Sequence, residues 1–223
     1  MNDVRNARVR LVVGRAHYDG PIRALREAKR SVWIATANLK DLHVEAPIGT
    51  RARAKGEYVS ITEVLRDLRR RGVEVRILHA SPPSRPFRAS LALTKEVATS
   101  LRQCPRNHMK LIIVDAEMLY LGSANFTGAG LGARGEGRRN FELGIVTDDD
   151  VLLDSAQALF ARIWAGKECA SCKLRSVCPK PIDLLVRPDR SAAEGESRPD
   201  RSAAEGESRP ARSPRAPNKN RLR

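Results

Sequence analysis

The sequence alternates short β-branched stretches with longer segments whose apolar residues recur at helical spacing. The first pattern is typical of buried strands, and the second is typical of helices that bury one face. The expected strands cover residues 9–13, 31–38, 73–80, 108–115, 118–122 and 141–147, and the expected helices cover 20–30, 60–72, 87–104 and 148–166. This alternation predicts an α/β layered fold, because a sheet must bury its faces under other elements.

The composition changes after Pro181. The segment RPDRSAAEGES occurs at 187–197 and again at 198–208, and a partial third copy begins at Arg209. A repeat without large apolar residues cannot bury a core. We therefore expect three parts: a folded domain over 1–166, a small Cys-rich segment over 167–186 and a disordered tail over 187–223.

The chain is strongly basic, with 41 Lys and Arg residues, 26 Asp and Glu residues and a formal net charge of +15. Most of the excess lies before residue 187, so it belongs to the folded part. Such a surface attracts polyanions, either nucleic acid or an anionic membrane. Because only 4% of the residues are aromatic, we expect a nucleic acid to be held through its phosphate backbone and not by stacking on its bases.

Two long segments, 39–59 and 127–139, show no clear period, and each contains a basic run. These runs are Arg51–Lys55 and Arg134–Arg139. Long loops on a rigid scaffold often carry function, but they can equally be solvated insertions. Either run would track phosphates only if the fold placed it beside the functional site.

The N-terminal region lacks the apolar core of a secretion signal. No stretch reaches the roughly 18 apolar residues that a membrane span needs. We therefore expect a cytoplasmic protein without a transmembrane segment. Cysteines in a cytoplasmic protein indicate metal binding or redox chemistry more often than they indicate disulfides.

A strand-like stretch carries a histidine and a lysine two positions apart. If residues 109–115 form a strand, His108 and Lys110 lie on one face, while Leu111 and Ile113 point into the core. Lysine supplies a fixed positive charge for a phosphate oxygen, and histidine can act as a nucleophile or an acid near neutral pH. Together they predict a phosphate site.

Small polar residues follow this pair and complete a recognisable pattern. His108-x-Lys110-x4-Asp115, with Ser123 and Asn125 after Gly122, resembles the HKD signature of the phospholipase D superfamily. The stretch NFEL also places Glu142 where the family carries an acidic residue. The resemblance covers roughly Val9 to Gly166 and implies the superfamily's layered fold, a mixed central sheet flanked by helices.

The pattern occurs once, because His17, His43 and His79 are not followed by the lysine and aspartate of the signature. We expect these three to be ordinary structural or surface histidines. Members of the superfamily bring two such motifs to one active site. The resemblance is therefore to the single-motif bacterial nuclease branch, and it implies a homodimer whose two-fold axis brings both copies of His108 together.

The resemblance also implies a mechanism that needs no metal. One His108 attacks phosphorus and forms a phosphohistidine, while the symmetry-related His108 protonates the leaving oxygen and then activates water. Lys110, Asn125 and Ser123 would stabilise the phosphoryl charge as cation and neutral donors. Glu142 would orient a histidine, and Asp115, off the end of the strand, would have a structural role.

The four cysteines suggest a metal site. Cys169, Cys172 and Cys178 lie close together, and Cys104 is a possible fourth ligand. Four thiolates can hold zinc or an iron–sulfur cluster, and the spacing resembles the iron–sulfur staple of some bacterial recombination and CRISPR-associated nucleases. Zinc, a cluster and three reduced thiols in a loop all remain open, and so does the role of Cys104.

Three functions fit these observations. The first is a phosphodiesterase that acts on nucleic acid as a rather unspecific endonuclease. The second keeps the chemistry but cleaves phospholipid, as phospholipase D does. The third is a catalytically inactive relative that binds nucleic acid in a phosphate groove. The motif, the single-copy architecture and the basic folded part favour the first.

Overall fold

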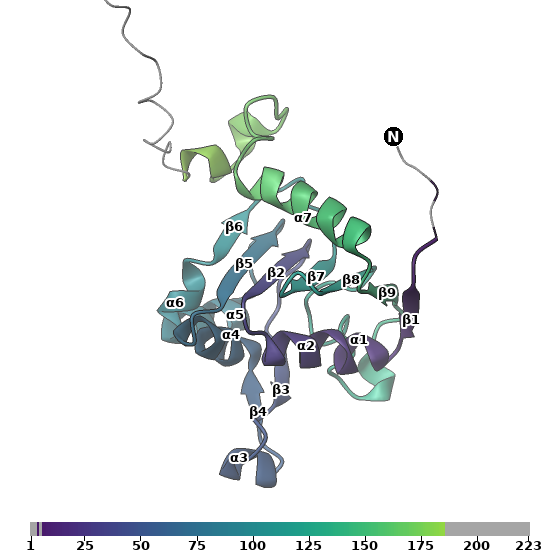
Figure 1. Cartoon of the computed structure of the whole chain (residues 1–223). Helices are drawn as coiled ribbons and strands as arrows, with labels where there is room; N and C mark the ends of the chain where they lie inside the picture. Colours follow the sequence, from purple (N-terminus) through teal and green to yellow (C-terminus); the bar gives the residue numbers. More distant parts are fainter. Residues whose placement is uncertain (1–3, 5, 186–223) are drawn as a thin grey trace, which may run out of the picture. The chain divides into compact units, whose positions relative to one another are not determined.

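A mixed sheet forms the centre of the protein (Figure 1). The structure is a computed structural model and describes residue 4 and residues 6–185. Seven strands of this described part form the sheet: β1 (Val9–Val13), β2 (Ser31–Thr36), β5 (Glu74–His79), β6 (Leu101–Gln103), β7 (Leu111–Val114), β8 (Met118–Gly122) and β9 (Leu143–Thr147). Their order is β1-β9-β8-β7-β2-β5-β6, in which β2, β5 and β6 are parallel and the other neighbours are antiparallel. The α/β fold with a mixed central sheet is confirmed.

Helices cover both faces of this sheet. They are α1 (Ala16–Asp19), α2 (Pro21–Glu27), α4 (Ile61–Arg70), α5 (Arg85–Leu93), α6 (Lys95–Ala98) and α7 (Asp150–Trp164). On one face, Leu25, Leu65 and Phe87 of α2, α4 and α5 share a core with β2, β5 and β7. On the other face, Leu153 and Phe160 of α7 pack in a second core with β7 and β8. Packing on both faces therefore holds the sheet, and with it the ends of its strands, in fixed positions.

The segment 39–59, expected to be a long loop, contains a small element of its own. Strands β3 (His43–Glu45) and β4 (Tyr58–Ser60) form an antiparallel pair, and the short helix α3 (Arg51–Ala54) lies between them. Arg53 of α3 forms an ion pair with Glu45. Figure 1 shows α3 at the bottom of the view, beyond the end of this hairpin and away from the central sheet.

The single helix expected over 87–104 is wrong in its second half. Helix α5 ends at Leu93, because Thr94 leaves the helical region with φ −127° and ψ 61°. The short helix α6 follows, and Leu101–Gln103 then pair in parallel with β5 as the edge strand β6. The backbone hydrogen bonds of this sheet edge outweigh the helical pattern of the side chains.

The strand of the motif is shorter than expected. β7 begins at Leu111, so His108 and Lys110 precede the strand and do not lie within it. Leu111 and Ile113 are buried as predicted, but Ile112 and Val114 are buried as well. Helices on both faces of the sheet explain why all four residues are buried. The polar residues of the motif can therefore be exposed only beyond the end of the strand.

Two expectations lie at the limits of the described chain. The tail over 187–223, with its repeats, lies outside the described residues, and the boundary at 166 stays a prediction. Of the helices in residues 6–185, none is long and apolar enough to cross a membrane. The cytoplasmic location remains a prediction.

Asp115 joins two loops at the end of the sheet opposite His108. Its carboxylate accepts backbone N–H groups from Lys29 at 2.9 Å, Arg30 at 2.7 Å and Ser31 at 2.8 Å. Partial burial disfavours the charged form, but these hydrogen bonds outweigh it, led by the one from Ser31, and lower the pKa of Asp115. These hydrogen bonds support the structural role of Asp115, which stays a prediction.

We predict that Asp115→Ala lowers the free energy of unfolding by about 1–3 kcal/mol at neutral pH, because three N–H groups lose their acceptor. Since the folded-state pKa is lowered, the contribution is present above the unfolded pKa of roughly 3.9 and is lost as the pH falls through the folded value. Urea titrations at several pH values measure both effects. Asp148→Ala, which removes an exposed ion pair with Arg8, is the control. An equal loss in the two variants would contradict the prediction.

Candidate active site

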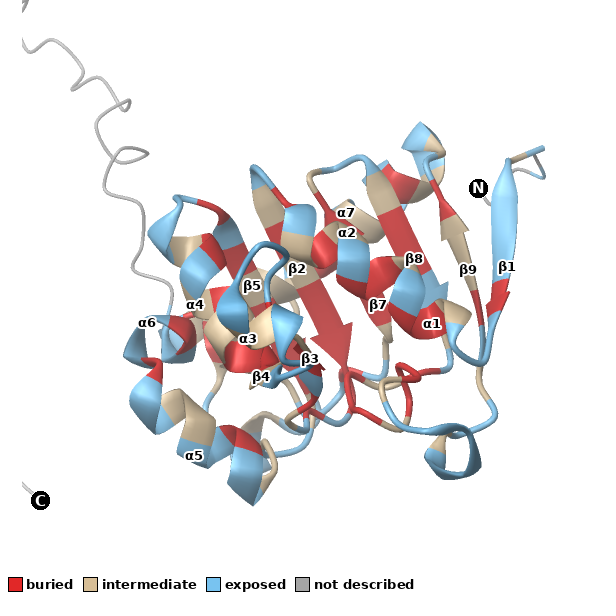
Figure 2. Cartoon of the chain, turned by 90° about the horizontal axis from the view of Figure 1, so that it is seen from below, coloured by how far each residue is buried: buried red, intermediate tan, exposed pale blue. Residues whose placement is uncertain are grey.

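The predicted site residues other than Asp115 gather at one edge of the sheet. Strands β2, β5 and β8 end at this edge, whereas β7 and β9 begin there. In Figure 2 the arrow of β2 points toward the edge, at the bottom of the view. The residues that the edge carries are His108, Lys110, Ser123, Asn125 and Glu142. Strand β8 pairs antiparallel with both β7 and β9. The start of β7, the end of β8 and the start of β9 therefore meet at this edge, and so do the residues beside them.

Asn107 fixes the segment that carries His108. Its side chain is 3% exposed, and Nδ2 donates to the carbonyl groups of Thr36 at 2.9 Å and Leu78 at 3.1 Å. These carbonyls belong to the last residue of β2 and the next-to-last residue of β5, so one amide bridges two strand ends. His108, the next residue, is exposed to solvent.

Lys110 lies against the ring of His108. Its Nζ atom is 3.3 Å from each ring nitrogen and donates to the His108 carbonyl at 2.9 Å. The backbone carbonyl of Lys110 accepts a hydrogen bond from Gly122 N at 3.1 Å, which fixes this segment against the end of β8. A phosphate oxygen held by Nζ would therefore lie within reach of the imidazole.

The amide of Asn125 has a fixed orientation. Its Oδ1 accepts the backbone N–H of Asn38 at 3.0 Å and lies 3.3 Å from Thr36 Oγ1. With Oδ1 occupied, Nδ2 must point elsewhere, and within residues 6–185 it has no hydrogen-bond partner. This arrangement leaves a neutral donor available for an anion.

Glu142 and Ser123 form a linked pair beside this donor. Ser123 Oγ donates to Glu142 Oε2 and accepts the backbone N–H of Leu143 at 3.1 Å. Asn140 Nδ2 donates to Glu142 Oε1 at 3.0 Å. In the described part of the chain the Glu142 carboxylate bonds to no histidine, so the predicted hydrogen bond between Glu142 and a histidine is not formed within this single chain.

A buried His17–Tyr120 pair supports the backbone of Glu142. His17 is 1% exposed, and its Nε2 lies 3.0 Å from the Glu142 carbonyl, which can only accept. Nε2 therefore carries a proton, and in the neutral ring Nδ1 accepts from the Tyr120 hydroxyl at 2.8 Å. Burial, with the nearby Glu142 charge, raises the pKa of Tyr120, which keeps this donor protonated. His17 is structural, as expected, but no sequence pattern links it to the site.

Glycine makes room for this pair. A Cβ atom on Gly122 would lie 2.8 Å from the Tyr120 hydroxyl and 2.8 Å from the Gly144 Cα atom. Any larger residue at 122 would separate β8 from β9 beside Ser123 and Glu142. The glycine of the motif is thus required by close approach of the two strands.

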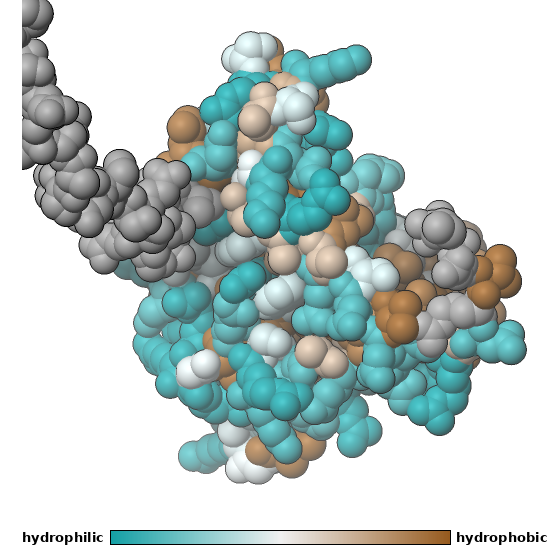
Figure 3. All heavy atoms as spheres, turned by 45° about the horizontal axis from the view of Figure 1, so that its top comes forward, coloured by the Kyte–Doolittle hydropathy of each residue, from teal (hydrophilic) through white to brown (hydrophobic). Residues whose placement is uncertain are grey.

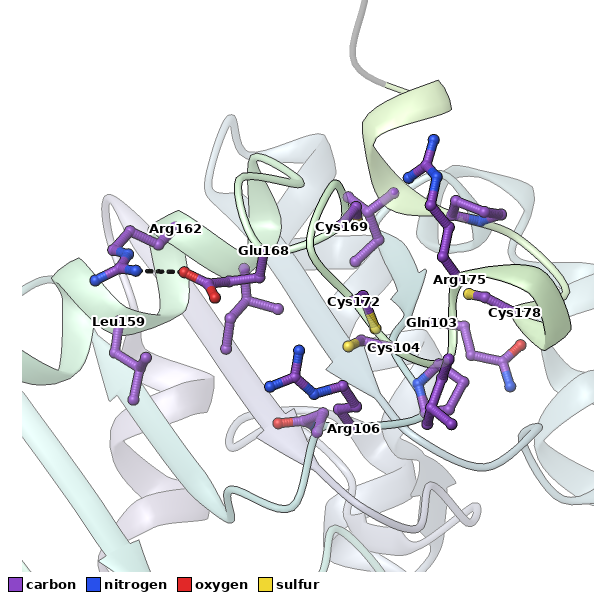
Figure 4. A pocket seen from close by; sticks show the side chains of 16 residues that line it. Gln103, Cys104, Arg106, Leu159, Arg162, Glu168, Cys169, Cys172, Arg175 and Cys178 are labelled. Atoms are coloured by element: carbon purple, nitrogen blue, oxygen red, sulfur yellow. Dashed lines mark hydrogen bonds and ion pairs between the residues drawn. The ribbon is translucent and has the colours of Figure 1, made fainter.

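The four cysteines line one cavity of about 230 Å³ next to the Asn107 segment (Figure 4). All four are free thiols. Burial raises the pKa of Cys104, whereas hydrogen bonds from the Leu174 backbone and Arg106 lower the pKa of Cys172. Within the described residues, no three His, Cys, Asp or Glu side chains are positioned to hold a metal ion. The structure therefore brings the predicted ligands into one cavity but does not show a metal site.

Solved structures resemble this chain at low sequence identity. NucT from Helicobacter pylori is 18% identical, with a TM-score of 0.48, over 70% of this chain and 95% of that one. Nuc from Salmonella typhimurium, described as a phospholipase D family member, is 20% identical with the same TM-score and coverage. The archaeal chromatin protein TrmBL2 is 16% identical, with a TM-score of 0.44, over 73% of this chain and 54% of that one.

Two sequence comparisons were informative in different ways. A search of curated proteins found no match, whereas a scan of family models identified the family. The family model described as "Cardiolipin synthase, PLD-like domain" matches residues 22–164, which is more than half of the chain and includes the whole His108–Glu142 region. The resemblance drawn from the motif is confirmed: the chain belongs to the phospholipase D superfamily, whose members are phosphodiesterases.

Proposed function

We propose that this protein is a metal-independent phosphodiester hydrolase that cleaves nucleic acid as an endonuclease. The observation that supports this function is the arrangement at one sheet edge of a histidine with a lysine against its ring, a free amide donor and a carboxylate–hydroxyl pair. Each group has a place in phosphoryl transfer, and none of the steps below requires a metal ion.

The reaction proceeds in two steps in a site shared by two copies of the chain. In the first, a ring nitrogen of His108 forms a bond to phosphorus, and the bond to the leaving oxygen breaks as the partner subunit's His108 gives that oxygen a proton. In the second, the same partner histidine takes a proton from water, and the resulting hydroxide displaces His108 from phosphorus. Lys110 and Asn125 Nδ2 hold the phosphoryl oxygens, and Ser123 assists through Glu142.

A second copy of the chain would supply the second histidine of the proposed mechanism, which one chain lacks. Within residues 6–185 the site holds one exposed histidine, and the Glu142 carboxylate bonds only to Ser123 and Asn140. Across a two-fold axis, each Glu142 would be available to orient a histidine of the partner, which gives this carboxylate the role that we predicted for it.

An apolar surface next to the site fits a second copy. We call it the β1 surface: Leu11, Val13, Leu121, Phe141 and Leu143, which are between 43% and 108% exposed. Leu11 lies opposite Ile145, which lies opposite Leu121, so the surface crosses β1, β9 and β8. Figure 2 shows β1 exposed along the sheet edge, and Figure 3 shows apolar residues at the right of the view, where β1 lies in Figure 1. Leu143 adjoins Glu142, so an interface here would place two sites side by side.

Positive charge favours a polyanionic substrate, and the place of one basic loop supports nucleic acid. The loop Arg134–Arg139 lies between Asn125 and Glu142, so both of its ends are attached to the site edge, and Arg134 and Arg138 are exposed. The other basic run belongs to α3, on the separate hairpin. The first loop is therefore the one placed to contact the phosphates that flank the scissile bond.

The first prediction concerns the chemistry. We expect the full chain to cleave plasmid, single-stranded DNA or RNA in the presence of EDTA, and His108→Ala to lower the rate by about 10³-fold or more because the nucleophile is lost. Gel assays measure both, with His43→Ala, an exposed histidine on β3, as the control. Cleavage of phosphatidylcholine vesicles but not of nucleic acid would indicate the phospholipase alternative. DNA binding without any cleavage, unchanged in His108→Ala, would indicate an inactive relative.

The second prediction concerns the basic loop. We expect Arg134→Ala with Arg138→Ala to weaken DNA binding and to reduce the slope of log K against log salt concentration by about 1 for each phosphate that the loop no longer binds. Arg51→Ala on α3, with Lys55→Ala directly after that helix, removes the same charge away from the site and serves as the matched control. Fluorescence anisotropy over a salt series measures the slopes. Equal decreases in both double variants would contradict a specific role for this loop.

The third prediction concerns the homodimer. We expect Leu11→Glu to produce a monomer with little cleavage activity, because a charge at the centre of the β1 surface cannot be buried without a partner. Leu93→Glu on α5, a position 82% exposed, is the matched control and should remain dimeric and active. Light scattering after size-exclusion chromatography measures the mass. A fully active wild-type monomer would refute the shared site.

A further inference from the structure

The four thiols of the chain converge although they are far apart in sequence. Cys104 follows β6, whereas the other three lie beyond α7, yet all four line the same cavity. The chain contains no other cysteine. In Figure 4 the sulfur atoms of Cys104 and Cys172 point toward each other across this cavity. Two separate segments therefore present every thiol of the protein to one space.

The backbone around each thiol is ordered by local hydrogen bonds. Cys104 N donates to the carbonyl of His79 at 2.8 Å, which ties the thiol to the end of β5. Cys169 N donates to Gly166 O at 2.9 Å, and Cys172 N donates to Cys169 O at 3.2 Å, so consecutive turns carry the CxxC pair. The last turn, η2 (Arg175–Val177), leads directly to Cys178.

The segment that carries three of these cysteines has little core of its own. Between residues 167 and 185 its regular structure consists of two 3-10 turns, η2 and η3 (Ile182–Leu184), and Ile182 is its one fully buried apolar side chain. Leu174, Val177 and Leu184 are exposed. Such a segment buries too little apolar surface to hold a defined conformation by itself, and short loop-rich segments commonly use a metal link for this purpose.

The cavity is larger than a single metal ion requires. Zinc binds thiolates at about 2.3 Å and would draw four sulfur atoms tightly around one point. No three ligand side chains of the described chain are positioned in that way, and the four thiols line, together with other residues, a cavity of about 230 Å³. A cluster of several iron and sulfide ions holds its four thiolates at the outside of a larger body.

The charges at the cavity suit an anionic group. A cluster held by four thiolates carries negative charge. Two arginines, Arg106 and Arg175, line the cavity together with the four thiols. The acid that lines it, Glu168, forms an ion pair with Arg162. The cavity therefore offers cations to the sulfur atoms.

We propose that Cys104, Cys169, Cys172 and Cys178 together bind an iron–sulfur cluster that fastens the C-terminal segment of the domain to the end of β6. The cluster takes no part in phosphoryl transfer. It would hold the segment between Cys104 and His108 from one side, while the bonds of Asn107 hold it from the other.

The test uses the full chain purified without oxygen, and again after incubation with ferrous iron and sulfide. We expect iron and acid-labile sulfide in equal amounts, with the broad visible absorption of a cluster. Cys104→Ser and Cys172→Ser should each lose most of the iron, whereas Ser171→Ala, an exposed residue within the same turn, should keep it. Protein without iron under both conditions, or protein containing zinc in its place, would overturn the proposal.

A second readout protects against a variant that fails to fold. Removal of iron from the wild-type chain by a chelator should lower the midpoint of thermal unfolding and expose the four thiols to alkylation. Reconstitution with iron and sulfide should reverse both changes. An unchanged midpoint and four thiols that react equally before and after chelation would contradict the fastening role.

Discussion

The hydrogen bonds of Thr36 at the end of β2 connect the two halves of the motif. Its carbonyl accepts the Asn107 side chain at 2.9 Å, and its hydroxyl accepts the Phe126 backbone N–H at 2.9 Å while donating to Asn38 O at 2.8 Å. Thr36 is 1% exposed, so these bonds do not compete with bulk water. His108 follows Asn107 and Asn125 precedes Phe126. The relative position of His108 and Asn125 thus depends on one buried threonine in the central strand.

The sequence predicted the parts of the fold that local chemistry determines. Strands β1, β2, β5, β7, β8 and β9 are read correctly because β-branched runs alternate with helical segments. Helix α4 lies within the segment 60–72, where a helix was expected, and Ser60 Oγ caps it by accepting the Thr62 N–H at 3.2 Å. The pairing of His108 with Lys110 followed from strand alternation, whereas Ser123, Asn125 and Glu142 were added by the resemblance to the superfamily's motif.

Other parts depend on contacts distant in sequence. The end of the 87–104 segment has helical spacing, but the open edge of β5 offers it a strand's hydrogen bonds. His17 has no sequence signal, because its role arises only when β8 and β9 approach closely enough to bury Tyr120. The convergence of Cys104 with Cys169 similarly depends on α7, which crosses the sheet and returns the chain to the end of β6. The spacing of the cysteines in the sequence does not predict this path.

The site combines a rigid foundation with an exposed reactive group. Asn107, Thr36 and His17 are each at most 3% exposed, whereas His108 faces solvent. The substrate that we propose, a nucleic acid, would need this exposure, since its backbone would have to pass over the imidazole without entering a closed pocket. Open access alone would leave the attacking nitrogen poorly positioned, so the buried amide and hydroxyl bonds must supply the precision that an enclosing pocket would otherwise give.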